Sequence, residues 1–460
     1  MRAPLRNVDA SWLRMDDPTN LMVVTGVLVL DGPVPVQRVR ALLKKRLLRF
    51  RRFTSRVVQP PGGVGTPSWE PDPDFSLARH LKVVKLKEPA DEPALQAYVS
   101  RLLGQPFPPD RPLWSFHFIP RFQGGSAIVA RIHHCIGDGL ALVHVLLSMA
   151  DGTPEPEGEE AGADIPWDDH GDDGPVARMA SWAITLPRRV RDGASHLFEH
   201  PGRLAEFALL ASGSAASLAN LLALPPDPAT AFKGPLTVGK KAAWSRAFEL
   251  DAFKDIGHVT GSTVNDILMA GLAGGLRRYL LGRGEVPRDL DVRGVVPVNL
   301  RPPEESNQLG NRFGLVFLAL PLGVEDPLDR LFEVRRRMRE LKNSPQALAI
   351  YQLLWLMGVA PKPVFDLVLE LFASKGTTVV TNVVGPKAPI SIAGAPLRQS
   401  MFWVPSAGRL GMGVSLLSYA GKVWMGLQCD AGLVPDPDVV LQGFEAEVGA
   451  LLQLRREAGP

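Results

Sequence analysis

The chain has 460 residues, of which 45% are hydrophobic and 22% charged, and its formal net charge is +3. This composition is that of a globular protein rather than a disordered one, and the length exceeds what one core of ordinary size organises, so we expect two domains. A charge this close to zero gives no case for nucleic acid as a partner, because such partners normally require a concentrated basic face.

The cysteines and the N-terminal sequence indicate in which cellular compartment the protein is expected. Cys135 and Cys429 lie far apart in the chain and do not form the disulfide framework of a small secreted protein. The first seventeen residues, MRAPLRNVDASWLRMDD, lack the apolar core of a signal peptide. Both features predict a cytoplasmic protein.

The first 150 residues alternate between strand and helix patterns, and we take residues 1–150 as an N-terminal domain. Residues 36–47 repeat apolar side chains at helical spacing, and residues 93–103 are a second predicted helix. Residues 113–122 and 126–134 are two apolar runs with a Gly-Gly break between them, which is typical of a β-hairpin. Further extended segments are predicted at 20–31, 50–58 and 80–86.

Residues 133–139, with the sequence HHCIGDG, end the second strand of that hairpin and precede a buried helix predicted at 140–149. An imidazole at such a turn can act as a general base, because its ordinary pKa lies near the working pH. A second interpretation is two core or metal-site histidines followed by an Asp-Gly turn. A Cys135–His134 nucleophile pair is not favoured, because neighbours on a strand point to opposite faces.

Residues 151–239 differ in character from the segments on either side. Residues 151–174 contain ten acidic residues and no Lys or Arg, which predicts a solvated linker. Residues 207–226 carry no charge and approach the ~20 residues of a membrane span, but several serines make them only mildly apolar. We interpret them as crossover helices, either buried between domains or resting one face on a bilayer.

Residues 240–460 return to strands and helices and are taken as a C-terminal domain. The helix predicted at 347–360 is uncharged and is either a core helix or the wall of a lipid tunnel or membrane contact. The other predicted helices are 250–258, 260–280, 326–343 and 443–457, and the predicted strands are 243–250, 291–299, 312–320, 377–384, 411–419 and 422–428.

Short motifs recur in a fixed order along the chain. They are PLW at 112–114, HHCIGDG at 133–139, ND at 265–266, PVNLRP at 297–302 and TNVVGP at 381–386. HHxxxDG resembles the signature of the CoA-dependent acyltransferase superfamily, which includes chloramphenicol acetyltransferase and peptide-synthetase condensation domains. The ordered set, over nearly the whole chain, resembles the bacterial wax ester synthase/diacylglycerol acyltransferase family. Thr381 and Val384 depart from the Ser and Pro of the family's SNVPGP motif.

The resemblance implies an α/β (α+β) fold of two chloramphenicol-acetyltransferase-like domains, with mixed sheets and an active-site tunnel between them. It also implies acyl-CoA as co-substrate and a long-chain alcohol or diacylglycerol as acceptor, at the inner membrane or at lipid inclusions. We expect no cofactor and no metal, because no zinc-type spacing surrounds the histidines. The alternatives are an acyltransferase with another acceptor and a non-catalytic lipid-binding protein of the same fold.

By the same resemblance, His134 is the expected general base, taking a proton from the acceptor hydroxyl and passing it to the CoA thiolate. His133 would orient the loop or line the tunnel. Asp138 would be structural, paired with an arginine for which Arg301 is the candidate, and Gly139 would have a backbone role.

Four further residues belong to the expected site. Asn265 is a candidate donor to the oxyanion, with helix capping or interdomain bonding as alternatives, and Asp266 is expected to be structural. Trp114 would pack beneath the active-site strand or contact substrate, and Asn382 would shape a tunnel-side turn. The chain has no G-x-S-x-G elbow, which weakens a hydrolase interpretation.

Overall fold

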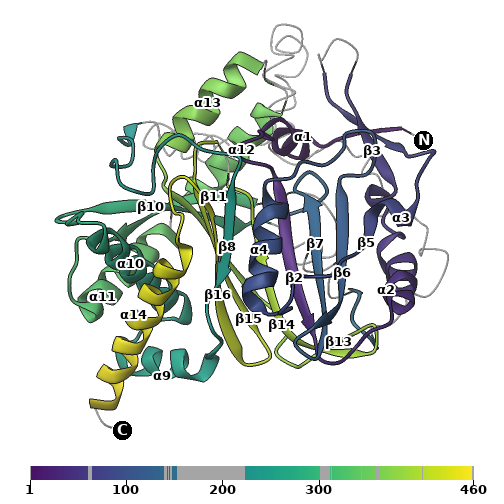
Figure 1. Cartoon of the computed structure of the whole chain (residues 1–460). Coiled ribbons are helices and arrows are strands. Elements are labelled where there is room, and N and C mark those ends of the chain that lie inside the picture. Colours follow the sequence, from purple (N-terminus) through teal and green to yellow (C-terminus); the bar gives the residue numbers. More distant parts are fainter. Residues whose placement is uncertain are drawn as a thin grey trace, which may run out of the picture.

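Two mixed β-sheets lie side by side with helices packed around them (Figure 1). The structure is a computed structural model, and it describes residues 2–60, 65–138, 142, 145, 148–152, 223–300, 311, 313–342, 344–358, 360, 362–406 and 408–457. A third, small sheet joins β1 (Ala3–Pro4), β4 (Ser68–Pro71) and β3 (Ser55–Val58) near the N-terminus.

The N-terminal sheet is built around the predicted hairpin, whose strands β6 and β7 pair antiparallel. Between the two strands the chain turns at Gln123 and Gly124, whose φ angles are 47° and 80°. Glycine adopts such a positive φ without strain. In spatial order the strands are β13 (Ser391–Ile392), β14 (Ala395–Trp403), β2 (Val23–Leu30), β7 (Gly125–His133), β6 (Trp114–Phe122) and β5 (Leu81–Val83).

Strand β14 comes from the C-terminal half of the chain but belongs to the N-terminal sheet. It pairs antiparallel with β2, with Met401 opposite Val27 and Trp403 opposite Thr25. The sequence analysis did not predict this strand. The N-terminal sheet is therefore completed by residues about 370 positions after its first strand.

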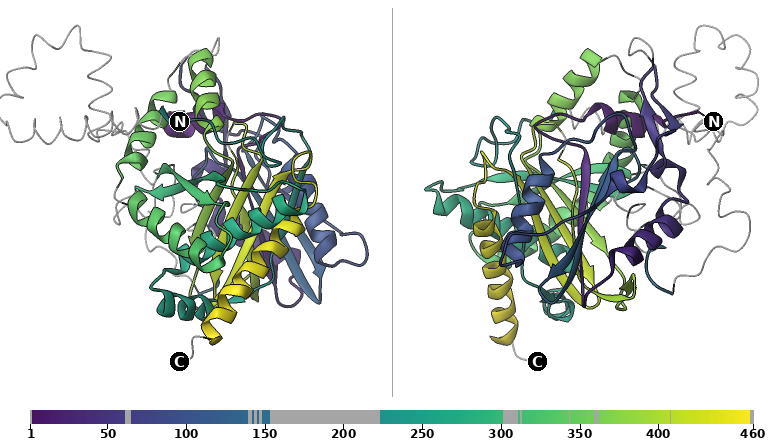
Figure 2. Two further views of the ribbon diagram at one scale, coloured as in Figure 1. Left: turned by 90° about the vertical axis from the view of Figure 1, so that its left-hand side faces the viewer. Right: turned by 45° about the vertical axis from the view of Figure 1, so that its right-hand side comes forward.

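The C-terminal sheet has a parallel centre, β10–β12–β15, and antiparallel neighbours on both sides. In spatial order its strands are β11 (Phe313–Pro321), β10 (Asp291–Asn299), β12 (Thr378–Val384), β15 (Met412–Tyr419), β16 (Lys422–Asp430) and β8 (Lys240–Trp244), with β9 (Phe248–Glu249) also paired to β16. The long helix α14 (Pro437–Glu457), yellow in Figures 1 and 2, runs along the outside of this sheet.

The helices follow the expected apolar periods in most places. In α4 (Glu92–Leu103), Leu95, Val99 and Leu102 are buried, and Asp91 caps the first turn by accepting the Ala94 N–H at 3.0 Å. The other helices are α1 (Asn7–Arg14), α2 (Val36–Leu42) with a π-helical extension to Leu47, α3 (Leu77–His80), α9 (Leu250–Thr260), α10 (Val264–Gly282), α11 (Pro327–Lys342), α12 (Gln346–Met357) and α13 (Lys362–Ser374).

One hydrophobic cluster joins the two halves of the chain. We call it the bridging cluster, and its fully buried members are Val8, Trp12, Met15, Met22, Phe313, Ile350, Leu354, Trp355, Met357 and Phe365. They come from α1 and the loop after it, β11, α12 and α13. The cluster thus connects the beginning of the chain to its C-terminal half.

Several sequence expectations need correction or lie outside the described residues. Extended structure was expected over 50–58, but Arg51–Phe53 is a 3₁₀ turn and only Ser55–Val58 is a strand. Phe53 is fully buried, so the turn inserts an aromatic anchor into the core. The acidic segment 153–174 and most of the uncharged segment 207–226 are not described. Among the described helices, none has the length and hydrophobicity that a bilayer crossing requires.

Candidate active site

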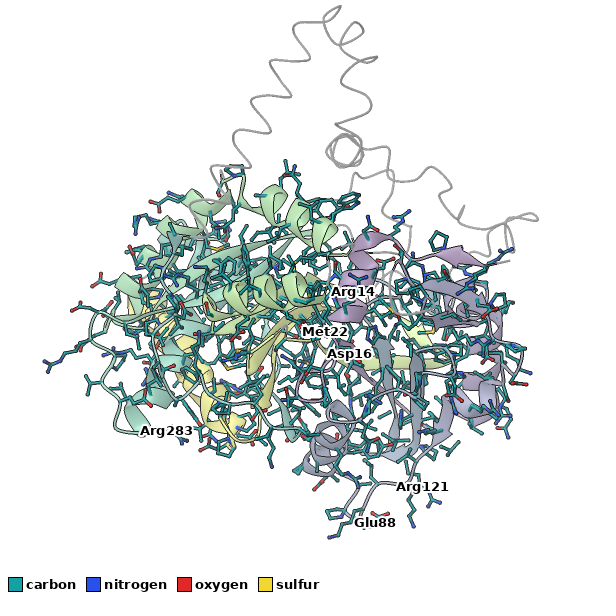
Figure 3. All side chains as sticks on the ribbon, turned by 90° about the horizontal axis from the view of Figure 1, so that it is seen from above. Arg14, Asp16, Met22, Glu88, Arg121 and Arg283 are labelled. Atoms are coloured by element: carbon teal, nitrogen blue, oxygen red, sulfur yellow. The ribbon has the colours of Figure 1, made fainter. Side chains whose placement is uncertain are left out.

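His134 lies directly after the last residue of β7, at the junction of the two halves. Its backbone N–H donates to the carbonyl of Met22 at 2.8 Å. Its imidazole stacks on the indole of Trp12, with ring centroids 4.3 Å apart and an interplanar angle of 24°, and Phe313 lies 5.8 Å away. Viewed from above, Met22 and Asp16 mark this junction (Figure 3). The predicted base therefore contacts one aromatic ring from each half of the chain, and these two rings also stack on each other, 5.7 Å apart.

The surroundings of His134 favour the neutral imidazole. Burial, and then the neighbouring His133, lower the pKa of His134 to about 3. The side chain is buried, and within the described residues its Nδ1 has no hydrogen-bond partner. At neutral pH the ring is consequently uncharged and has a lone pair available for a proton.

His133 faces a different environment from His134. Its Nδ1 accepts the N–H of Cys135 at 3.1 Å, which leaves its proton on Nε2, 3.6 Å from Oδ1 of Asp16. Burial lowers the pKa of His133, but Cys135 and Asp16 raise it by more, so the pKa lies above its ordinary value. The same Asp16 oxygen accepts the N–H of Met22 at 2.7 Å, so His133 and Asp16 brace the strand end.

Only part of the predicted pairing at Asp138 can be followed. Asp138 is buried, and its backbone carbonyl accepts the N–H of Leu142 at 2.9 Å, as at the start of the helix predicted there. The described positions 142, 145 and 148 are helical. Gly139 and Arg301 lie outside the described residues, so the ion pair between Asp138 and Arg301 stays a prediction.

The motifs ND and TNVVGP meet in space. The side-chain N–H of Asn382, on β12, donates to Oδ1 of Asn265 in the first turn of α10 at 2.9 Å. Helix α10 is capped by Thr263 and Asp266, whose side chains each accept the other's backbone N–H in a capping box. Asn265 is thus not the capping residue, and its bond to Asn382 lies within the C-terminal half.

Trp114 packs into the core of the N-terminal half. It is 1% exposed, its indole N–H donates to the carbonyl of Phe53 at 2.8 Å, and its ring stacks on His80 at 4.4 Å. The backbone carbonyl of Leu113, one residue earlier, accepts the N–H of His133 at 2.9 Å. The PLW motif therefore lies next to the histidine motif through the backbone.

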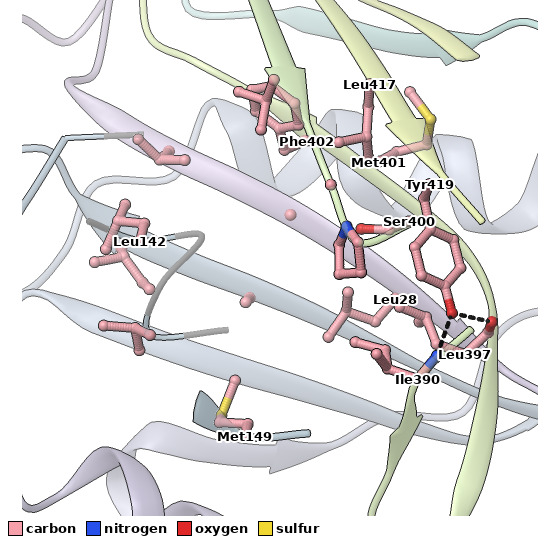
Figure 4. Close-up of a pocket in the computed structure, with 18 of the residues that line it drawn as sticks. Leu28, Leu142, Met149, Ile390, Leu397, Ser400, Met401, Phe402, Leu417 and Tyr419 are labelled. Atoms are coloured by element: carbon pink, nitrogen blue, oxygen red, sulfur yellow. Dashed lines mark hydrogen bonds between the residues drawn. The ribbon is translucent and has the colours of Figure 1, made fainter. Parts of the chain in front are cut away.

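An apolar pocket lies on the face of β2 and β7 (Figure 4). Ile132 and Ala130 of β7 line it, and His134 follows Ile132 by two residues, directly after the strand ends. Gly385 and Pro386 also line it, so the TNVVGP turn borders this pocket. The rest of its wall includes Val24, Gly26, Leu28, Leu142, Val145, Met149, Met401, Phe402, Leu417 and Tyr419.

The wall of the pocket is almost entirely apolar, and the hydroxyl of its tyrosine has two hydrogen-bond partners. The hydroxyl of Tyr419 donates to the carbonyl of Leu397 at 3.0 Å and accepts the N–H of Ile390 at 2.9 Å, as the dashed lines in Figure 4 show. The described residues contain no group of three or more His, Cys, Asp or Glu that could hold a metal ion. Such a pocket suits a hydrocarbon chain rather than a polar ligand.

Two polar residues that the sequence does not single out, Arg52 and Asn311, contact the motif, and a third, Asp9, binds both of them. Trp12 was also missed. These residues are far from the motif in sequence and share no spacing with it, so a single sequence gives no signal of their convergence.

Comparison with known proteins identifies relatives over the full chain. Residues 5–268 match the family model of the wax ester synthase/diacylglycerol acyltransferase catalytic domain, and residues 309–451 match that of the WS/DGAT C-terminal domain. A Mycobacterium tuberculosis protein named as a probable diacylglycerol O-acyltransferase is 28% identical, and the match covers 98% of this chain and 96% of that protein.

Solved structures show the same fold. The wax ester synthase/diacylglycerol acyltransferase from Marinobacter aquaeolei VT8 superposes with a TM-score of 0.68 at 20% identity, covering 99% of this chain and all (100%) of that one. The first condensation domain of the calcium-dependent antibiotic synthetase superposes with a TM-score of 0.63 at 17% identity, covering 99% and 96%. The expected fold class is confirmed by these two matches.

Proposed function

The chain belongs to the wax ester synthase/diacylglycerol acyltransferase family, and from this premise we propose that it transfers a fatty acyl group from acyl-CoA to the free hydroxyl of diacylglycerol, forming triacylglycerol. The relative named as a diacylglycerol O-acyltransferase supports this acceptor. The observation that carries the proposal is that His134 is buried and neutral. It follows by two residues Ile132, which lines the apolar pocket.

The reaction needs no covalent enzyme intermediate. The acceptor oxygen attacks the carbonyl carbon of the thioester while its proton passes to the neutral imidazole of His134. The carbon–sulfur bond then breaks, the thiolate leaves with the bonding electrons, and the imidazolium returns the proton to it. The products are one ester and free CoA, and the imidazole is neutral again.

The low pKa of His134 has two consequences for this sequence of steps. The ring needs no deprotonation before it accepts a proton at neutral pH. An imidazolium in this apolar setting is strongly acidic, so it holds the proton only while the tetrahedral intermediate carries negative charge nearby, and it then passes the proton to the thiolate.

The apolar pocket supplies the binding energy for the acyl chain. Each methylene transferred from water into such a pocket contributes about 0.8 kcal/mol. Because Ala130 and Ile132 line the pocket and His134 follows directly after the end of their strand, an acyl chain in the pocket would have its thioester carbonyl near the imidazole. We place the acyl chain here, against strands β2 and β7.

The proposal is tested by CoA release from palmitoyl-CoA with dioleoylglycerol or hexadecanol as acceptor. Release that requires dioleoylglycerol, and that falls by about 10²–10⁴ in a folded His134→Ala variant, is the expected result. Faster release with hexadecanol would make the chain a wax ester synthase instead. Undiminished turnover by His134→Ala would exclude this base, and no turnover with either acceptor would favour the lipid-binding alternative.

We further propose that the acceptor is taken up from a lipid surface, because diacylglycerol does not dissolve in water. Helix α13 stands at the edge of the molecule (Figure 1) and exposes an apolar ridge formed by Val364, Leu367 and Leu371, which are 51%, 69% and 39% exposed. On its inner side, Phe365 belongs to the bridging cluster that contacts His134 through Trp12. A short amphipathic helix of this kind lies in a membrane interface and does not span it.

Flotation with vesicles of dioleoylphosphatidylcholine and dioleoylglycerol tests this surface. We expect Leu367→Glu to reduce the bound fraction, since it places a charge on the ridge, and Val286→Glu to leave it unchanged. Val286 is a matched control because it is 62% exposed and lies outside α13. Equal binding by both variants, or recovery of the wild type only in the soluble fraction, would exclude the ridge as the lipid contact.

A further inference from the structure

The backbone N–H groups of His134, Cys135 and Ile136 all have partners. His134 donates to the carbonyl of Met22 at 2.8 Å, and Cys135 donates to Nδ1 of His133 at 3.1 Å. Ile136 donates to the carbonyl of His133 at 3.0 Å. This side of the motif is fixed by the adjoining strands and by the first histidine.

The carbonyl groups of the same three residues are held by two side chains from remote parts of the chain. The amide of Asn311 donates to the carbonyl of His134 at 2.9 Å. The guanidinium of Arg52 donates to the carbonyl of Cys135 at 3.2 Å and to that of Ile136 at 2.9 Å. The orientation of the three peptide groups therefore depends on where these two donors are placed.

Asp9 connects the two donors. Its Oδ1 accepts the amide of Asn311 at 2.7 Å, and its Oδ2 accepts the guanidinium of Arg52 at 2.9 Å. The carboxylate is fully buried, at 0% exposure, so it is stable only with these partners in place. Because each carboxylate oxygen of Asp9 binds one donor, Asp9 fixes the positions of Asn311 and Arg52 relative to the motif.

Helix α1 reaches His134 by a second route. Trp12 follows Asp9 by three residues, so both side chains lie on one face of the helix. Trp12 stacks on the imidazole, while Asp9 acts on the backbone behind it. Helix α1 is in turn fixed to the C-terminal half, because the Ser11 hydroxyl donates to the carbonyl of Leu354 at 2.6 Å.

We propose that Asp9 is a positioning residue for the catalytic imidazole: through Asn311 and Arg52 it orients the peptide groups of His134–Ile136, and with them the ring of His134. The inference rests on the proposed function in so far as His134 is the base. Catalytic groups must be held within about 0.5 Å of their productive position, and a misplacement of about 1 Å costs on the order of 10² in rate.

Two variants separate positioning from folding. Asn311→Ala removes the donor to the carbonyl of His134 but leaves the Asp9–Arg52 ion pair in place. Asp9→Asn replaces one acceptor oxygen by an NH₂ group, which then faces the N–H donor of Arg52 or of Asn311. For each we expect kcat per folded molecule to fall about 10–100-fold with KM changed less than about twofold. Because both act on one network, we expect the double variant to lose no more than the worse single variant.

Asp227→Asn is the matched control. Asp227 is likewise a fully buried carboxylate, at 0% exposure, but its partner, at 2.8 Å, is Arg293 on β10 of the C-terminal sheet. We expect this variant to lose stability as Asp9→Asn does while its kcat per folded molecule is unchanged. An equal loss of kcat in Asp227→Asn, or a kcat within twofold of wild type in Asn311→Ala, would overturn the proposal.

Hydrogen exchange at residues 132–137 provides a readout that does not depend on turnover. We expect Asn311→Ala to speed exchange of the His134 and Cys135 amides relative to the wild type, and Asp227→Asn to leave it unchanged. Unchanged exchange in Asn311→Ala would overturn the positioning role. If the wild type releases no CoA but Asn311→Ala still exchanges these amides faster, the positioning role is upheld and the proposed function is contradicted.

Discussion

At the scale of single residues, burial decides which protonation state of His134 is present. The pKa of about 3 means that the ring is neutral throughout the physiological range. The acid limb of kcat/KM for acyl-CoA should therefore lie well below the ordinary histidine pKa of about 6.5, and the profile should stay flat from pH 8 to about 5. A limb near pH 6.5 would mean that His134 is accessible to water or that another group limits the reaction.

The pH profile needs a stability control, because the same burial acts on folding. His134 and His117 both have a folded-state pKa lowered to about 3, chiefly by burial. Between pH 6.5 and 3 the unfolded chain binds protons that the folded chain does not, so stability falls as the pH falls through this window. The folded fraction at each pH, from near-ultraviolet circular dichroism, must accompany each rate.

Trp12 gives a second prediction at this scale. Replacing it by Ala removes the ring that stacks on His134 and opens a cavity in the bridging cluster, at a cost of about 3–5 kcal/mol. Trp12→Phe keeps an aromatic face and should retain most of the stability and activity. Urea unfolding and kcat per folded molecule measure both effects, with Trp424→Phe, also buried but outside the bridging cluster, as control. Equal kcat in Trp12→Ala and wild type would show that the stack has no catalytic role.

The residue-scale prediction from sequence was accurate only where a local motif existed. The motif placed His134 at a strand end, and the structure has it directly after His133, the last residue of β7. Asp9 and Asn311 are 302 residues apart and touch each other through a fully buried carboxylate. Nothing in a single sequence couples two such positions, because the contact depends on the packing of α1 against the C-terminal half.

At the scale of elements, the strands with uninterrupted apolar runs were predicted well, whereas several other elements, α1, α13 and β14 among them, were not predicted. β7, β10 and β15 match the expected runs to within a residue or two. Helix α1 was missed because Asp9 and Ser11 are on its buried side, which breaks the apolar period. β14 was missed because glycines and prolines flank it and its partner, β2, is remote in sequence.

A prediction at this scale concerns the face that β2 turns to the pocket. A methyl group at Gly26 would meet only the carbonyl of Met401, at 3.7 Å, which is an ordinary contact. Gly26→Ala should therefore be tolerated, whereas Gly26→Leu should fill part of the pocket. We expect Gly26→Leu to lower kcat/KM for palmitoyl-CoA at least tenfold more than for octanoyl-CoA, because the longer chain loses its space.

The experiment is informative because the two substitutions differ only in volume. If Gly26→Leu keeps the chain-length preference of the wild type while folding normally, the acyl chain does not occupy this pocket. If Gly26→Ala already abolishes turnover of both substrates, strand β2 has lost its register and the variant reports on folding.

At the scale of the whole molecule, the two halves are joined by many contacts within the described residues, among them three between regular elements. β14 completes the N-terminal sheet beside β2. Helix α4 of the N-terminal half lies beside β8, where the Ser100 hydroxyl accepts the N–H of Ala242 at 2.9 Å. Helix α1 packs on α12 through the bridging cluster. The candidate active site lies beside the last of these, since Trp12 of the bridging cluster stacks on His134 and Asn311 binds its carbonyl, so its geometry depends on both halves.

The division of the chain into domains at residues 150 and 240 stays a prediction. Division by sequence follows chain order, whereas the hydrophobic core of the N-terminal half includes Trp244, Met401, Trp403 and Trp424 from the other half. Chain order could not show this, because the exchange of β14 is a property of the assembled sheets.

We expect the intact protein to unfold in a single cooperative transition, and a chain ending at Gly152 to show none. Without β14, strand β2 would present an unpaired edge, and the side chains packed under Met401 and Trp403 would be exposed to water. Differential scanning calorimetry of the intact chain and urea unfolding of the shortened chain measure this. Two well-separated transitions, or a cooperative transition in the shortened chain, would mean that the halves are independent domains and that the pairing of β14 contributes little to stability.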